Sequence, residues 1–396
     1  MNLFRAEGEL NSEDYLTAVY RMRSRTNLRD AAWALAIGQS VGNPNVRNQW
    51  ETEELFRNHS CMIVGNEEDL SSENHGLVKI AFPVVNTNWK EDGINHLMCQ
   101  LMGGQMDIDI ISECRLMDIR IPESVRKHFP KPTYGITGFR DFTGNYNKPF
   151  LGGIVKPKTG ISPAVLLEMT KQLVDGGVDF IKEDEILANP AFCSLEDRVP
   201  LIANYLASQS RKVIYCFAIN GEPHTVESRA RFVAENGGNG VHINFWSSFG
   251  SYHTITRMGK LFVHYQKSGD KVITDFRNPY GIEWNVLCKL AGLAGVDSIH
   301  SGMWGGYMSE DENDLRKTLD ILHRDNVVPA LSCGMHPGLV QAINDRFGVH
   351  YMANVGGAIH GHPGGTIAGA RAMRQAIDKI HGTEYNEAIN KWGLVS

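Results

Sequence analysis

The sequence lacks long hydrophobic runs and blocks of basic residues. No stretch of its 396 residues approaches the ~18 apolar residues that a membrane span needs. Lysine and arginine form no block, and the formal net charge is −6, so there is no electrostatic footprint for nucleic acid or for an anionic membrane. We therefore expect a small molecule, and neither nucleic acid nor membrane, as the partner.

The sequence also lacks the cysteine pattern of a disulfide framework and the apolar segment of a signal peptide. Its seven cysteines are scattered without CxxC spacing, which predicts reduced thiols. The N-terminal residues MNLFRAEGELNSEDYL carry acidic side chains where a signal peptide would be apolar. We expect a cytoplasmic protein.

Length and composition fit two globular domains. Hydrophobic residues make up 42% of the chain and charged residues 21%, which is typical of a folded protein with a sizeable core. The length accommodates a small domain followed by a barrel of about 250 residues. We expect a smaller α+β domain of ferredoxin-like type over residues 1–145. We expect an α/β domain, a (β/α)8 TIM barrel with C-terminal helices, over residues 146–396.

The two parts of the chain show different patterns. In the first part, residues 29–37 and 94–102 are helix-like and residues 61–65 and 77–85 are strand-like. The proline-containing HFPKPTYG, residues 128–135, marks a change of composition. The first part therefore predicts a compact α+β domain.

Eight short β-branched runs with amphipathic stretches between them predict the barrel. Between the first two runs lies a well-marked helix, with Ser162 as N-cap, Pro163 in the first turn, and Gly176 and Gly177 at its end. Strands that alternate with helices predict right-handed parallel units, and eight of them predict a closed barrel, with an open doubly wound sheet as the alternative. The runs are LGGIVKPK, VDFIKEDE, KVIYCFAIN, GVHINFW, LFVHYQK, VDSIHSG, VVPALSCG and HYMANVGG.

The end of the second run, IKEDE, is unusually rich in titratable groups. Side chains two positions apart on a strand share a face, so Lys182 and Asp184 can converge, and Glu185 joins them if the strand ends there. Clustered carboxylates suit a hard cation such as Mg²⁺. The same pattern is equally typical of a solvated charged turn. An ammonium on Lys182 would repel Mg²⁺, whereas a carbamate formed with CO2 would supply an anionic oxygen ligand.

Several motifs resemble those of the RuBisCO superfamily. GGVDFIKEDE resembles its strand-two signature, LGGIVKPKTGIS its strand-one motif and VDSIHSG its strand-six motif. SCGMHPG and NVGGAIHGHPGG are similar to its strand-seven and strand-eight phosphate loops, and RLMDIRIPESV extends a weaker likeness to the N-terminal domain. The resemblance covers the whole barrel and identifies the chain as a member of this superfamily.

The resemblance implies a set of site residues. Lysine 182 would carry the carbamate and bind Mg²⁺ together with Asp184 and Glu185, and Lys156 would shuttle a proton with the support of Lys158. Glycine-rich loops let backbone N–H groups close around a phosphate. The implied catalytic residues are Lys156, Lys158, His264 and His300, and the implied phosphate-binding or substrate-binding residues are Lys267, Ser332, Gly334, Gly356 and Gly357.

Departures from the family pattern argue against carboxylation. Tyr307 stands where the carboxylases carry a lysine in a mobile loop. Gln266 and Lys267 replace a histidine and an arginine, and a lysine cannot replace the two-pronged grip of an arginine on a phosphate without loss. In the N-terminal domain, the segment around QSVGNP resembles one from which carboxylases supply residues to the neighbouring subunit, but it carries Gly38, Asn43 and Pro44 instead.

Without carboxylation and without a second phosphate site, the family chemistry that remains is the formation of an enediolate on a singly phosphorylated substrate. Mg²⁺ would stabilise this enediolate as a Lewis acid. The first candidate is decarboxylation of a 3-oxo-isoapionate 4-phosphate type substrate. The second is the 2,3-diketo-5-methylthiopentyl-1-phosphate enolase reaction, whose base is a lysine near the position of Gly104, where none occurs. Isomerisation of 5-methylthioribulose 1-phosphate and a non-catalytic regulatory role are further alternatives. The resemblance also implies a homodimer or higher homo-oligomer.

Overall fold

The structure, a computed structural model, describes residues 2–43 and 47–395. It contains two compact units, one of residues 1–130 with 269–293 and one of residues 131–268 with 294–396. These units differ from the predicted ranges 1–145 and 146–396 in two places, because residues 131–145 belong with the barrel and residues 269–293 belong with the first unit.

The first unit is an α+β fold, as predicted. Its six-stranded sheet has the order β1-β3-β4-β2-β5-β11. The antiparallel core β3-β4-β2-β5, with α1 and α4 as the connecting helices, has the ferredoxin-like arrangement. The strands are β1 (Phe4–Arg5), β2 (Tyr15–Ser24), β3 (Met62–Val64), β4 (His75–Pro83), β5 (Ile111–Arg120) and β11 (Tyr280–Ile282). The helices are α1 (Leu28–Gly38), α2 (Glu53–His59), α3 (Glu67–Ser72), α4 (Gly93–Leu101), α5 (Glu123–Arg126), α11 (Lys271–Thr274) and α12 (Trp284–Leu293), with short 3-10 turns at Val84–Asn86 and Gly104–Asp107.

The second unit is a closed eight-stranded parallel barrel, which confirms the predicted fold. Its order is β10-β12-β13-β14-β6-β7-β8-β9, and all eight predicted runs contribute one strand each. The ring closes where β14 pairs with β6, Met352 lying opposite Phe150. The strands are β6 (Phe150–Ile154), β7 (Phe180–Lys182), β8 (Ile214–Ala218), β9 (Gly240–Asn244), β10 (Phe262–Gln266), β12 (Ser298–Gly302), β13 (Val328–Leu331) and β14 (Met352–Val355).

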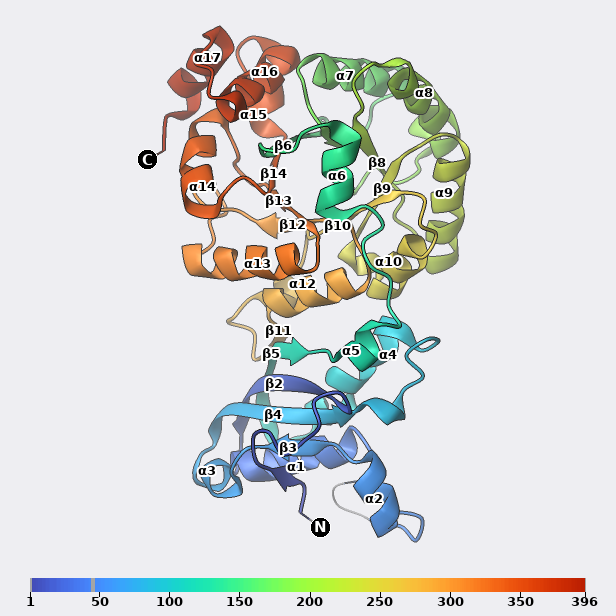
Figure 1. The fold of residues 1–396 in the computed structure, drawn as a ribbon, viewed down its shortest axis with the longest axis vertical. Coiled ribbons are helices and arrows are strands. Elements are labelled where there is room, and N and C mark those ends of the chain that lie inside the picture. Colours follow the sequence, from blue (N-terminus) through green and yellow to red (C-terminus); the bar gives the residue numbers. More distant parts are fainter. Residues whose placement is uncertain (1, 44–46, 396) are drawn as a thin grey trace. The chain divides into compact units, whose positions relative to one another are not determined.

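Helices surround this barrel (Figure 1). The predicted helix after β6 is confirmed, with the Ser162 side chain accepting a hydrogen bond from the backbone of Val165 and Gly176 at its C-cap. The helices are α6 (Gly135–Thr143), α7 (Pro163–Asp175), α8 (Leu195–Ser208), α9 (Pro223–Glu235), α10 (Phe249–Thr256), α13 (Glu312–Arg324), α14 (Val340–Phe347), α15 (Gly357–His360), α16 (Gly365–Asp378) and α17 (Thr383–Trp392), with short 3-10 turns at Ala191–Cys193, Phe245–Ser247 and Pro337–Leu339.

Aromatic side chains fill the barrel at the N-terminal ends of its strands. Phe139 of α6 packs against Phe150, Phe180 and Phe262, with ring centroids 5.0 to 6.2 Å apart. All four side chains are buried. Because α6 supplies this packing, it belongs to the barrel although it precedes residue 146. The opposite, C-terminal end of the barrel remains available for a site, as is usual for this fold.

Among residues 2–43 and 47–395, no helix is both long enough and apolar enough to cross a membrane.

Candidate active site

A cavity of about 620 Å³ lies at the C-terminal ends of the barrel strands. Its lining comes from residues at or just after the ends of β6, β7, β10, β12, β13 and β14. The predicted site residues that line it are Lys156, Lys158, Lys182, Asp184, Glu185, His300, Ser332, Gly334, Gly356 and Gly357. The other two predicted residues, His264 and Lys267, are absent from this lining.

Strand alternation divides the charges at the end of β7 between two faces. Lys182 and Asp184 point into the cavity. Glu183, between them, points the other way and forms a fully buried ion pair with Arg198 of α8, at 2.8 Å. The Glu183 carboxylate also accepts a hydrogen bond from the backbone N–H of Ala218 in β8. The buried pair thus fixes the strand end from which Lys182 and Asp184 project.

The Lys182 side chain is only 1% exposed and lies among polar groups. Its Nζ donates a hydrogen bond to Oε1 of Gln266, at 3.0 Å, and lies 3.8 Å from Oε2 of Glu185. The Gln266 amide in turn donates to the Glu185 carboxylate. Burial lowers the pKa of Lys182 below its ordinary value, although the nearby carboxylates of Glu185 and Asp184 oppose this. The neutral amine, which is the form that reacts with CO2, is therefore a larger fraction of Lys182 than of a surface lysine at the same pH.

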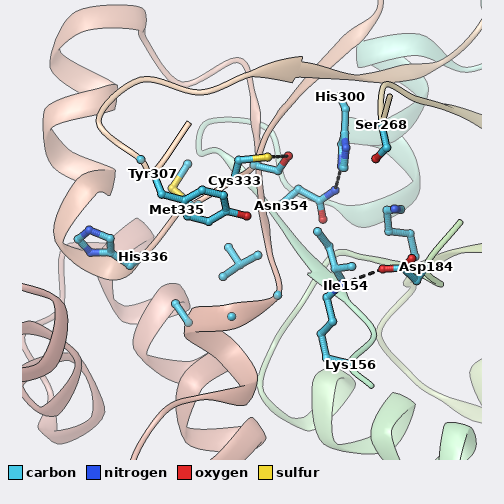
Figure 2. Close-up of a pocket in the computed structure, with 18 of the residues that line it drawn as sticks. Ile154, Lys156, Asp184, Ser268, His300, Tyr307, Cys333, Met335, His336 and Asn354 are labelled. Carbon is cyan, nitrogen blue, oxygen red and sulfur yellow. Dashed lines mark hydrogen bonds and ion pairs between the residues drawn. The ribbon is translucent and has the colours of Figure 1, made fainter. Parts of the chain in front are cut away.

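Asp184 pairs with the lysine at the end of the neighbouring strand. Nζ of Lys156 donates to Oδ2 of Asp184 at 2.7 Å (Figure 2). Burial raises the pKa of Asp184, but the hydrogen bond and charge of Lys156 outweigh burial, and the pKa lies below its ordinary value. Asp184 is thus held as a carboxylate, with the Lys156 amine beside it.

The donor set fits Mg²⁺ on one condition. Among residues 2–43 and 47–395, no three His, Cys, Asp or Glu side chains gather as a metal-binding group. The cluster offers two carboxylates, Asp184 and Glu185, and the Lys182 amine. A carbamate on Lys182 would add the third anionic oxygen donor, which matches the hard oxygen ligands that Mg²⁺ prefers.

The two predicted catalytic histidines lie at different depths. His300 lines the cavity, and its Nε2 accepts a hydrogen bond from the Asn354 amide at 2.8 Å. His264 lies inside the barrel, with Nδ1 2.8 Å from the hydroxyl of Ser298 and with no hydrogen-bond partner for Nε2 among the described residues. Burial, and then the charge of Lys182, lower the pKa of both histidines well below the ordinary value. Both rings are therefore neutral near pH 7.

The predicted phosphate loops lie where β13 and β14 end. Gly334 has φ +112°, and a Cβ there would lie 2.6 Å from the backbone nitrogen of Tyr307. A side chain at this position is excluded both by backbone conformation and by space. Gly357 has open space around its missing Cβ, and a Cβ on Gly356 would approach the Lys156 side chain at 3.4 Å. Backbone groups of these loops are therefore accessible from the cavity.

The end of the cavity away from Lys156 and Asp184 is formed by aromatic and sulfur-containing side chains. Tyr307, Met335 and His336 lie there in Figure 2, with Asn354 between them and the charged end. Trp392 of α17 also contributes to the lining. Tyr307 is 80% exposed, so it stands at the open side.

Some site residues were missed by the sequence reasoning. Asn354 stands as a single polar residue inside the strand-eight run, a signal that could have identified it as the partner of His300. Glu310 lies in the acidic segment SED after the β12 loop, and its carboxylate pairs with Lys267 at 2.9 Å. No local pattern indicates that pairing, because 43 residues separate the two positions.

The substituted positions of the N-terminal domain lie in the first unit. Gly38 ends α1, and Gly104 begins a 3-10 turn. Asn43 is described, whereas Pro44 lies outside the described residues. The sequence between Lys90 and Lys127 contains no lysine, so no lysine occurs near Gly104 in the chain.

Two family models cover nearly all of the sequence. The ribulose bisphosphate carboxylase large chain catalytic domain matches residues 135–392, and the N-terminal domain of the same chain matches residues 6–125. The chain belongs to the RuBisCO large-chain family. The predicted membership of the superfamily is confirmed, and the chain is a RuBisCO-like protein.

Relatives of different activity within the RuBisCO family are about equally similar to this chain. A ribulose bisphosphate carboxylase of Pyrococcus furiosus is 31% identical, with 92% of this chain and 91% of the relative covered. A 2,3-diketo-5-methylthiopentyl-1-phosphate enolase of Geobacillus kaustophilus is 30% identical, with 96% and 98% covered. A 3-oxo-isoapionate-4-phosphate decarboxylase of Rhizobium etli is 30% identical, with 91% and 92% covered. Overall identity therefore does not choose among these activities.

Solved RuBisCO structures share the fold. The octameric ribulose-1,5-bisphosphate carboxylase/oxygenase of Pyrococcus horikoshii superposes with a TM-score of 0.88 at 26% identity, covering 100% of this chain and 97% of that one. The two-part architecture is thus that of the RuBisCO large chain.

Proposed function

We propose that this protein is a Mg²⁺-dependent RuBisCO-like enzyme that decarboxylates a singly phosphorylated 3-oxo sugar acid of the 3-oxo-isoapionate 4-phosphate type. The observation that carries the proposal is the cluster of Lys156, Lys182, Asp184 and Glu185 at one end of the cavity. A non-catalytic relative would have no reason to keep all four side chains together. The enolase and decarboxylase relatives are consistent with a reaction other than carboxylation, because each is about as similar to this chain as the carboxylase is.

The carbamate on Lys182 and the carboxylates of Asp184 and Glu185 would hold Mg²⁺. When bound, the ion would polarise the substrate carbonyl and stabilise negative charge on its oxygen. In a 3-oxo acid, the bond to the carboxylate carbon breaks, CO2 leaves, and the electron pair moves toward that oxygen. A proton must then return to carbon. Lys156, whose Nζ lies 2.7 Å from Asp184, is placed to deliver that proton.

The departures from the carboxylase pattern favour this reaction. Tyr307 has no positive charge with which to hold a new carboxylate, although it lines the cavity. Decarboxylation generates the carbanion by loss of CO2, so it needs no base near Gly104. The sequence offers no lysine there.

The second candidate is the enolase reaction on 2,3-diketo-5-methylthiopentyl-1-phosphate. The aromatic and sulfur-containing side chains of Tyr307, Cys333 and Met335 favour it, because they would pack against a methylthio group. Isomerisation of 5-methylthioribulose 1-phosphate would use the same apolar contact. We further propose a homodimer or larger homo-oligomer, as in the octameric relative, which a 44.1 kDa mass by light scattering would contradict.

Preincubation tests the metal and carbamate part of the proposal. We expect activity to rise when the protein is preincubated with bicarbonate and Mg²⁺, because the carbamate must form before the ion binds. Lys182→Ala should lose activity by at least about a thousandfold and should no longer incorporate labelled CO2. Full activity in a chelator and without CO2 would contradict this part.

The reaction itself is tested with the three candidate phosphates. We expect CO2 release from the 3-oxo acid alone, with the product identified by proton NMR. Proton exchange or tautomerisation of the diketo substrate without CO2 release would instead select the enolase, and a changed carbonyl position in 5-methylthioribulose 1-phosphate would select the isomerase.

A further inference from the structure

An ion pair joins the end of β10 to the loop between β12 and α13, beside the cavity. Nζ of Lys267 lies 2.9 Å from Oε1 of Glu310, and the two side chains are 20% and 29% exposed. Gln266 and Ser268, which flank Lys267 in the chain, both line the cavity. Tyr307, which lies in the same loop as Glu310, also lines it. The pair therefore lies against the substrate space although neither partner is in its lining.

The position of the Glu310 carboxylate is built into the loop. The backbone N–H of Glu310 donates to the carbonyl of Met303, at 2.8 Å, and Met303 is fully buried. Gly302 has φ +108°, and a Cβ there would lie 2.3 Å from either carboxylate oxygen of Glu310. A side chain at position 302 would displace the Glu310 carboxylate from this position. The ion pair is therefore part of the loop's architecture and differs from a chance surface contact.

This pair determines what charge the substrate meets on that side. Lys267 is the cation at the end of β10. Burial and other charges lower the pKa of His300 in the cavity wall most, and the charge of Lys267 lowers it further, so Lys267 lies near this wall. With Glu310 in place, the positive charge of Lys267 is compensated. A second phosphate placed beside Lys267 would meet the Glu310 carboxylate at the same place, and like charges in a partly buried wall repel each other.

We propose that Glu310 is a specificity-determining residue, which neutralises Lys267 and so excludes substrates with a second phosphate. Lys267 then serves as the partner of Glu310 and not as a phosphate ligand. The inference rests on the proposed function, since it requires a phosphorylated substrate in the cavity. It adds a structural reason for the single phosphate, namely that the substrate carries an uncharged group next to Lys267.

Calorimetric titration with two probes tests this inference. Ribulose 5-phosphate and ribulose 1,5-bisphosphate are titrated into the native protein and into Glu310→Gln, both with Mg²⁺ and bicarbonate. Glutamine keeps the size of the side chain and removes its charge, so Glu310 no longer compensates the positive charge of Lys267 or repels a second phosphate. We expect the affinity for the bisphosphate, relative to the monophosphate, to rise at least about tenfold in the variant.

Three further variants serve as controls. Glu310→Asp keeps the charge and should keep the native ratio of affinities. The double variant Glu310→Gln with Lys267→Met should not show the rise in relative affinity for the bisphosphate, because the positive charge of Lys267 is absent. If melting curves show that Glu310→Gln is unfolded, Glu310→Ser removes the same charge with a smaller side chain.

The outcomes separate this inference from the proposed function. A ratio of affinities unchanged in both Glu310→Gln and Glu310→Ser would overturn the role of Glu310 while leaving the phosphate site in place. Failure of the native protein to bind either probe would overturn the proposed function, and the inference with it.

Discussion

At the scale of single residues, the site depends on side chains that never touch the cavity. Glu183 and Arg198 are both completely buried and form a two-pronged ion pair, with oxygen to nitrogen distances of 2.8 and 3.0 Å. Tyr215 and the backbone of Ala218 add hydrogen bonds to the carboxylate. Because Glu183 stands between Lys182 and Asp184, this pair fixes the direction of both cavity-facing side chains.

Removal of Arg198 should therefore affect stability and activity together. Arg198→Met leaves the Glu183 carboxylate buried without its counter-charge. We expect the free energy of unfolding to fall by about 3–5 kcal/mol, measured by urea unfolding followed by circular dichroism. Activity at a temperature where the variant is folded should also fall.

The same substitution on the surface provides the control. Arg231 pairs with Glu227 on the exposed face of α9, where the arginine side chain is 58% exposed. Arg231→Met should cost no more than about 0.5 kcal/mol, because water replaces the lost partner. Equal losses in the two variants would show that the buried pair has no special role.

At the scale of elements, a buried carboxylate joins the start of β12 to α6 and β10. Asp297 accepts hydrogen bonds from the backbone N–H groups of Tyr134 and Gly135, before α6, and of Val263 in β10, at 2.7 to 2.9 Å. Its burial raises the pKa to about 6, although the three N–H donors act in the opposite direction. This carboxyl therefore holds a proton more tightly in the folded protein than in the unfolded chain.

The sign of the pH effect follows from that difference. The stabilising contribution of the protonated Asp297 is complete below the unfolded pKa, and it is lost as pH rises through the folded pKa of about 6. The shift from the ordinary value of 3.8 corresponds to about 3 kcal/mol.

Asp297→Asn, which cannot ionise, isolates this effect. The stability of the native protein relative to this variant should fall by about 3 kcal/mol between about pH 4 and pH 7. Urea unfolding at several pH values measures the difference. A difference that stays constant or grows with pH would contradict the raised pKa.

At the scale of the whole molecule, one segment leaves the barrel and completes the other unit. After Ser268 the chain enters the first unit, where β11 pairs in parallel with β5, and it returns to the barrel before β12. Arg115 of β5 holds this segment. The fully buried guanidinium donates to the Glu283 carboxylate and to the carbonyl groups of Thr274 and Asp275.

Loss of this contact should loosen residues 269–293 selectively. Arg115→Met leaves the Glu283 carboxylate and the carbonyl groups without their donor, at a cost of about 1–3 kcal/mol. We expect trypsin to cleave after Lys271 or Arg277 at least about tenfold faster, because local opening becomes more frequent. Mass spectrometry of the fragments identifies the site.

Glu283→Gln is the milder comparison, since it keeps an acceptor oxygen for Arg115. Its cleavage rate should lie between those of the native protein and Arg115→Met. An Arg115→Met protein cleaved at the native rate would show that other contacts hold the segment.

The sequence by itself determined the elements of this protein. Eight apolar runs became eight strands, and the helix after Ser162 begins and ends as its capping residues indicate. Strand β2, Tyr15–Ser24, was not predicted, although its buried and partly exposed residues alternate. These features are local: hydrophobic period, caps and strand-end polarity depend on residues near in the chain. The motif at Lys182, Asp184 and Glu185 is local in the same sense.

Only the tertiary structure decided the contacts between distant residues. Closure of the barrel brought Gln266 to Lys182, Asn354 to His300 and Glu310 to Lys267. It also placed His264 inside the barrel, outside the cavity lining. The physical reason is that such pairs form only when the closed barrel gathers the ends of strands far apart in sequence around one cavity, and no periodicity along the chain records which residues will meet.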